Sequence, residues 1–267
     1  DHRDLHSFPT RRSSDLCLNE AGGWRLRWDA SPLGYLRTAA HGHADAQHVS
    51  LWFKGVALVI DPGTGAYYAD GKLRAWLASR AAHNGPSPAA WDFPKRLGPF
   101  LWAEQHPRPK LQMPAPGAPE GEAVCELALP QGTLRRTVRR IGPENGWSVA
   151  DQLIPAGGTS GAFSVLWQFA PGSLVEQLGE RRFLIRRSGV AIQVIAGPEW
   201  AEVCLSVPNQ SQNTSVEPGI VSPGFRQTTH APYLKLVAPD SKACVFHTTF
   251  LRSEEHTSEL QSLAYLV

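Results

Sequence analysis

The segment LRRTVRRIGPENGWSVADQLI, residues 134–154, contains two alternating runs separated by a turn. Side chains at every second position share one face of an extended strand, so Leu134–Ile141 and Trp147–Ile154 are each expected to form a β-strand. Asn145-Gly146 between them is a typical turn pair. The same alternation predicts further strands at residues 24–28, 49–53, 124–129, 163–169, 183–187, 190–195, 203–207, 234–237 and 243–250.

Long helices are not expected in this chain. Twenty-four glycines and twenty-two prolines interrupt it at short intervals, which favours turns. One short helix is expected over residues 71–82, and loops are expected over 105–121 and 208–218. Many short strands without a strand–helix–strand rhythm are typical of an all-β protein, so we predict a large antiparallel β-sandwich.

The charges are nearly balanced, with 26 Lys and Arg against 24 Asp and Glu. The main basic run is Leu134–Arg140, in which alternation places Arg136 on the same face as Leu134 and Val138. We expect a solvated strand face there, since surface charge costs little. Nucleic-acid binding is not expected, because it requires a more concentrated basic patch. No apolar run approaches the ~20 residues of a membrane span, so membrane insertion is not expected.

A second informative stretch is His41-Gly42-His43-Ala44-Asp45, which is followed by Asp61-Pro62-Gly63 and by His83-Asn84. Two histidines at positions i and i+2 of an extended segment point to the same side and could share one cleft. Imidazole and carboxylate together suit zinc. Each element also has an ordinary interpretation, because Asp-Pro-Gly is strong turn chemistry and His83 could lie in a loop without a role.

The ordered set of motifs resembles the C-terminal part of the heparinase II/III family of polysaccharide lyases. The resemblance covers about seventy residues, from Pro32 to Trp102, and the rest of the chain agrees in its strand-rich character. The matching motifs are Leu33–Leu36, Ala39–Ala46, Leu58–Thr64, Arg74, Ala81–Asn84 and Gly98–Trp102.

The resemblance implies a role for each matching residue. His41 is expected to contact substrate and to take part in catalysis. A zinc ion, structural rather than water-activating, is expected on His43, Asp61 and His83. Substrate-binding residues are expected at Tyr67, Arg74 and Arg80. The chain departs from the family pattern at Gly65, at Ala78 and Arg80, and at Gly85, and these departures concern substrate preference rather than the metal set.

The implied reaction is β-elimination on a uronic-acid-containing, anionic polysaccharide. One alternative is a non-catalytic carbohydrate-binding or structural sandwich. Another is a metal-dependent hydrolase of the amidohydrolase type, which needs repeated strand–helix units that are not evident after residue 85. The residues themselves do not indicate a compartment, while the resemblance suggests a periplasmic or secreted protein.

Both ends of the chain resemble translated sequencing adapter, at Arg11–Leu16 and at Arg252–Ser262. We therefore expect residues 1–16 and 252–267 to be non-native tails around one sandwich domain at 17–251. In the family, a helical toroid domain with a catalytic tyrosine precedes the sandwich. That helical domain is the expected partner, and little lyase activity is expected from this chain alone.

Overall fold

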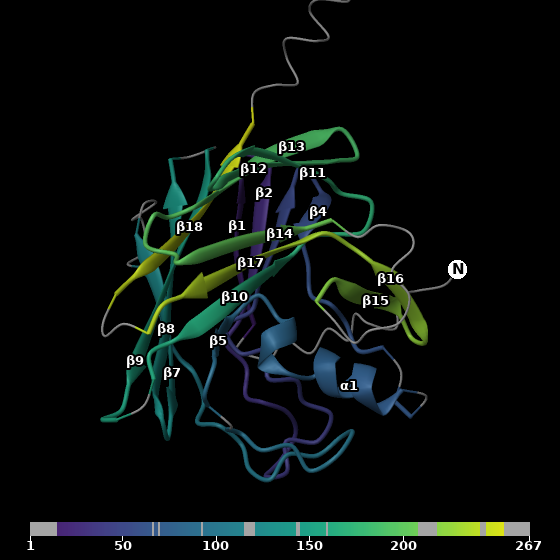
Figure 1. Ribbon diagram of the computed structural model, residues 1–267, viewed down its shortest axis with the longest axis vertical. Coiled ribbons are helices and arrows are strands. Elements are labelled where there is room, and N and C mark those ends of the chain that lie inside the picture. Colours follow the sequence, from purple (N-terminus) through teal and green to yellow (C-terminus); the bar gives the residue numbers. More distant parts are fainter. Residues whose placement is uncertain are drawn as a thin grey trace, which may run out of the picture.

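The computed structural model describes residues 15–253, apart from 66, 69, 92, 115–120, 143–144, 159, 208–217 and 241–243, and gives only the backbone for 15–21. Within these residues the chain is built mainly from antiparallel strands (Figure 1). The predicted all-β class is confirmed.

The largest sheet has eight strands, in the order β11-β12-β13-β18-β9-β8-β7-β6. Their bounds in that order are Leu174–Gly179, Arg182–Arg187, Val190–Ala196, Phe246–Arg252, Gly146–Pro155, Gly132–Ile141, Glu122–Leu129 and Lys110–Gln112. Asn145 lies in a turn and Gly146 begins β9, whose register with β8 places Leu134 opposite Leu153.

Two four-stranded sheets and one hairpin complete the described strands. The first sheet has the order β1-β2-β3-β4, with bounds Asp15–Ala21, Trp24–Asp29, Val49–Phe53 and Val56–Val59. The second has the order β14-β17-β10-β5, with bounds Glu202–Ser206, Tyr233–Ala238, Phe163–Gln168 and Pro86–Pro88. The hairpin consists of β15, Ile220–Gly224, and β16, Gln227–His230.

One hydrophobic core joins the three larger sheets. It contains buried residues of β2 and β3, of β7 to β9, of β10 and β17, and of β12, β13 and β18. Along β7 every second residue is buried, as the alternation predicts. The apolar face of each sheet is therefore covered by its neighbours, which is the physical basis of a sandwich.

Arg136 corrects the expectation of a solvated face on β8. Its side chain is fully buried and makes two hydrogen bonds to Asp151 of β9, at 2.7 and 2.8 Å. The guanidinium lies 5.1 Å from the ring of Trp167. Arg135, one residue earlier, stays partly exposed and pairs with Glu126 at 3.2 Å.

The predicted helix over residues 71–82 is divided in two. Helix α1 spans Gly71–Leu77, and its N-cap Asp70 accepts hydrogen bonds from the backbone N–H groups of Lys72 and Leu73. A 3₁₀ turn follows at Arg80–Ala82. Among the described residues, no helix has the length and apolar character that a membrane span requires.

Some of the segments predicted as loops or tails contain strands. A short strand, β6, lies inside the loop predicted at 105–121, whereas nearly all of the loop at 208–218 falls outside the described residues. Strand β1 begins at Asp15 and β18 ends at Arg252, so both strands reach into the segments expected to be tails.

Candidate functional site

The loop that carries His41 is held tightly. Gly42 lies against the carbonyl oxygen of Leu33, where an added Cβ would be only 1.5 Å from that oxygen. His41 has φ = 58°, a conformation that is uncommon for residues with a side chain and that clusters at functional sites. Its N–H donates to the Phe100 carbonyl at 2.8 Å, and the indole N–H of Trp102 donates to the Gly42 carbonyl at 3.1 Å.

The side chain of His41 remains exposed at the surface of this loop. Its ring centroid lies 5.0 Å from that of Phe100 and 5.9 Å from that of Tyr67. Tyr67, a predicted substrate-binding residue, is therefore next to His41, the predicted catalytic residue.

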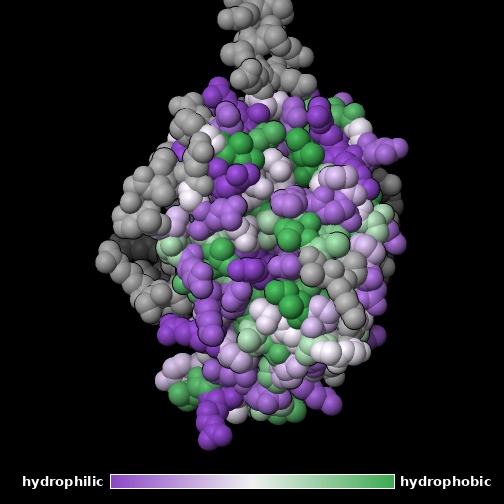
Figure 2. Space-filling view, turned by 90° about the vertical axis from the view of Figure 1, so that its left-hand side faces the viewer, coloured by the Kyte–Doolittle hydropathy of each residue, from purple (hydrophilic) through white to green (hydrophobic). Residues whose placement is uncertain are grey.

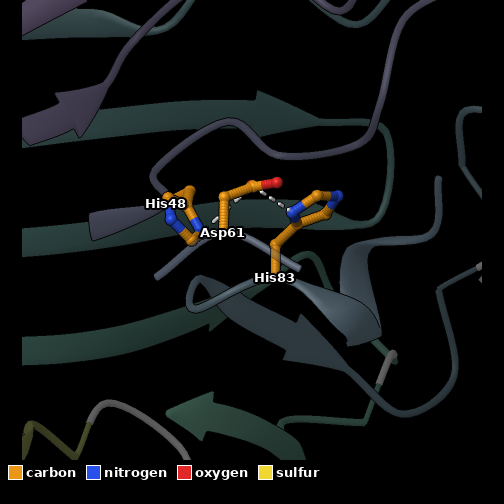
Figure 3. A group of neighbouring side chains, drawn as sticks. All are labelled: His48, Asp61 and His83. Atoms are coloured by element: carbon orange, nitrogen blue, oxygen red, sulfur yellow. Dashed lines mark hydrogen bonds and ion pairs between the residues drawn. The ribbon is translucent and has the colours of Figure 1, made fainter. Parts of the chain in front are cut away.

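Three potential metal ligands, His48, Asp61 and His83, lie close together (Figure 3). His48 immediately precedes β3, Asp61 follows β4, and His83 ends the 3₁₀ turn. The ligand atoms all lie within 4.8 Å of one another, and both histidines are buried. This group could hold a metal ion.

The carboxylate of Asp61 sets the charge of the group. Its Oδ2 lies 2.9 Å from Nδ1 of His83 and 3.8 Å from Nδ1 of His48. Burial opposes the negative charge, but the attraction of His83 and their hydrogen bond outweigh it and hold the pKa of Asp61 well below its usual range. Burial likewise opposes the charge on His83, yet Asp61 raises the pKa of His83 above its ordinary value.

The two buried imidazoles differ in what their nitrogens contact. Nδ1 of His48 accepts a hydrogen bond from the backbone N–H of Asn84 at 3.0 Å, and its Nε2 lies 2.9 Å from Oγ of Ser50. In contrast, Nε2 of His83 is buried and has no hydrogen-bond partner. The carboxylate of Asp61 contacts the other ring nitrogen of His83, Nδ1, so Nδ1 is the atom that could share a metal ion with Asp61. His48 would have to lose the Asn84 bond before it could bind a metal.

His43, predicted as a zinc ligand, lies beside His83 but is not in the compact group. The two ring centroids are 5.4 Å apart. Nε2 of His43 is 2.6 Å from Nη1 of Arg74, and because a guanidinium can only donate, that nitrogen accepts. Burial, with the nearby charge of His83, lowers the pKa of His43 to about 3. The ring is therefore neutral, as metal coordination requires.

Asn84 connects the segments that carry the group. Its side-chain amide donates to the carbonyls of Val49 at 2.9 Å and Ile60 at 3.0 Å, and its side-chain oxygen accepts from the backbone N–H of Gln168 at 2.9 Å. Sequence reasoning missed the roles of both Asn84 and His48. For Asn84 the only signal in the sequence was its position directly after His83, and His48 carried no comparable signal.

The other two predicted substrate-binding residues occupy different places. Arg74 is buried; its Nε donates to the Pro99 carbonyl at 3.1 Å, and its guanidinium lies 5.9 Å from the ring of Tyr67. Arg80 instead lines a cavity of about 200 Å³ together with Arg96, Trp91 and Trp102. Neither His41 nor Tyr67 lines that cavity, whereas Arg74 lies against the ring of Tyr67, which is next to His41.

A protein-family model described as "Heparinase II/III-like, C-terminal" matches residues 11–245. This chain belongs to the heparinase II/III-like family. The resemblance stated from residues 32–102 is thus confirmed over most of the sequence. No curated protein matches the chain.

Solved structures have the same fold as this heparinase II/III-like domain. Heparan sulfate lyase HepC from Pedobacter heparinus matches with a TM-score of 0.63 at 17% identity, over 90% of this chain and 35% of that one. The heparinase III product of the BT4657 gene matches with a TM-score of 0.64 at 16% identity, over 89% and 34%. The chain therefore spans about one third of the length of these proteins, and the likeness shows the fold.

Proposed function

We propose that this heparinase II/III-like domain is the C-terminal part of a polysaccharide lyase that cleaves a uronic-acid-containing polysaccharide by β-elimination. The observation that carries the proposal is the exposed His41 imidazole, held on a strained loop two residues before His43, whose ring lies 5.4 Å from that of His83. The loop sequence alone would not distinguish a lyase from a binding module.

β-Elimination requires three events at the substrate. A base removes the proton next to the uronate carboxylate, negative charge builds up on that carboxylate, and the bond to the leaving oxygen breaks. We assign His41 to the cleft as an acid/base or charge-stabilising residue, because its imidazole is exposed and its backbone is fixed by Phe100. Tyr67 and Arg74 are assigned to substrate binding, because Tyr67 is a neighbour of His41 and Arg74 is a neighbour of Tyr67.

We further propose that the domain binds zinc through His43, Asp61 and His83. Two features support this set: the carboxylate of Asp61 beside Nδ1 of His83, and the neutral ring of His43 next to that of His83. His48 is the competing third imidazole. A bound zinc ion would link separate segments of the chain. Its role would then be structural, holding the cleft loop on the sandwich.

The metal proposal is tested by measuring bound zinc with mass spectrometry, and thermal stability, in four variants. Asp61→Asn and His83→Ala should each lose zinc and melt at a lower temperature than the wild type. His43→Ala and His48→Ala identify the third ligand, since the one that coordinates the metal should lose zinc as well. Zinc content and melting temperature that stay at the wild-type level in all four variants would remove the proposal.

The catalytic proposal is tested on the chain joined to the helical domain expected from the family. Unsaturated product from heparan sulfate is followed by its ultraviolet absorbance. We expect turnover in the joined protein and its loss in His41→Ala, while the 267-residue chain alone should show little. Polysaccharide binding without turnover, unchanged by His41→Ala, would instead indicate a non-catalytic carbohydrate-binding sandwich.

A further inference from the structure

We propose that Phe225 completes an aromatic subsite beside His41, which stacks against a sugar ring of an anionic polysaccharide. The proposal rests on the proposed function and extends it to residues far from the sequence motif. We use the term aromatic wall for the four side chains involved: Tyr67, Tyr68, Phe100 and Phe225.

The rings of the aromatic wall contact one another in a continuous series. Ring centroids are 5.2 Å apart for Phe225 and Tyr67, 5.3 Å for Tyr67 and Phe100, and 5.1 Å for Phe100 and Tyr68. His41 lies against two members of the series, Tyr67 and Phe100. The wall therefore borders the imidazole that we assign to the cleft.

Much of the aromatic wall faces solvent. The exposed fraction is 39% for Tyr67, 82% for Tyr68 and 52% for Phe225. Grouped exposed aromatic rings are typical of binding surfaces rather than of a solvated face. Across the face seen in Figure 2, by contrast, hydrophilic residues separate small hydrophobic areas.

The β15–β16 hairpin fixes the position of Phe225. The backbone N–H of Ser222 donates to the Pro62 carbonyl at 2.7 Å, and that of Arg226 donates to the Gly65 carbonyl at 3.0 Å. Gly63 allows this close approach, because a Cβ there would lie 2.3 Å from the Ser222 carbonyl oxygen. The hairpin is thus attached to the segment that follows Asp61, and Figure 1 shows it between the sheet strands and α1.

The surroundings favour an anionic sugar as the occupant. An aromatic ring packs against the C–H face of a pyranose, while the hydroxyl groups at the sugar's edge stay in water. Arg74 lies 5.9 Å from the Tyr67 ring, behind the wall, and Arg226 follows Phe225 as an exposed residue. These two positive charges complement a carboxylate or a sulfate group.

The test is calorimetric titration of the full chain with a heparan sulfate tetrasaccharide, with a neutral cello-oligosaccharide as the control ligand. Phe225→Ala should weaken the Kd for the anionic tetrasaccharide roughly three- to tenfold, and Phe225→Trp should retain it. Phe225→Leu keeps apolar bulk without a ring and should weaken binding as Phe225→Ala does. The control variant is Leu174→Ala on β11, whose side chain is 71% exposed.

The outcomes separate this proposal from the proposed function. Tetrasaccharide binding by the wild type that is equally strong in Phe225→Ala, Phe225→Leu and Leu174→Ala refutes the aromatic subsite alone. A wild-type chain that binds no uronic-acid oligosaccharide refutes the subsite together with the substrate class. Weaker binding in Phe225→Ala, with zinc content and melting temperature unchanged in all four metal-site variants, supports the subsite and removes the metal proposal.

Discussion

Replacing Arg136 with methionine should be one of the most damaging single changes in the core. The substitution keeps a long apolar stem but removes both hydrogen bonds to Asp151, whose carboxylate is fully buried. It also removes the donor that Nη1 supplies to the carbonyls of Gln47, at 2.8 Å, and of Asn84.

The size of the effect follows from these contacts. Breaking a buried ion pair by removing one partner costs about 3–5 kcal/mol of unfolding free energy, because the other charge stays buried. Losing the donor to two buried carbonyls adds about 1 kcal/mol each at the lower end of the usual range. The total of roughly 5–7 kcal/mol corresponds to a melting temperature roughly 10–25 °C lower for a domain of this size.

Urea denaturation followed by circular dichroism measures this loss. Arg135→Met is the matched control, because Arg135 is partly exposed and pairs with Glu126 at the surface; it should cost no more than about 1 kcal/mol. The double variant Arg136→Met/Asp151→Leu should recover most of the ion-pair cost, since no lone charge remains buried. Unfolding of Arg136→Met at the same urea concentration as Arg135→Met, or a double variant no more stable than Arg136→Met, would contradict the ion-pair cost.

Two further predictions concern the cleft loop and the pH dependence of stability. In Gly42→Ala the added Cβ would overlap the Leu33 carbonyl oxygen, so the loop that carries His41 should not be able to adopt its observed conformation. Weaker zinc binding and faster proteolysis in this loop would show this effect. Wild-type values for both would contradict it. Burial lowers the pKa of His106 from 6.5 to about 4, so the unfolded chain binds this proton more readily than the folded one. Above pH 6.5 the imidazole of His106 is neutral in both states and does not lower the unfolding free energy. As the pH falls from 6.5 toward 4, the unfolded chain takes up the proton first, so the unfolding free energy decreases. His106→Gln should flatten the fall in unfolding free energy over that range, and an unchanged slope would argue against a role for His106.

The sequence by itself determined the fold class and one part of the site. Alternation between apolar and polar residues is a local property, so strands such as Glu122–Leu129 and Gly146–Pro155 could be expected without knowing their partners. The resemblance to the heparinase II/III family implied a site shared by Asp61 and His83, and the structure places their side chains 2.9 Å apart.

Tertiary structure alone decided which face of β8 is buried. Alternation separates Arg135 from Arg136 but does not show which of them points inward. The choice depends on the pairing with β9, which places Asp151 opposite Arg136, and on the ring of Trp167 beneath it. The burial of a charge is a property of its partners, and those partners lie in other strands.

The same reason explains the elements that sequence reasoning missed. Strand β11 is mostly exposed and lacks alternation, so it is recognised only through its pairing with β12. Phe225 reaches Tyr67 only because the β15–β16 hairpin is hydrogen-bonded to the segment after Asp61. Local periodicity specifies a strand and its two faces, whereas contacts between distant segments specify what each face meets.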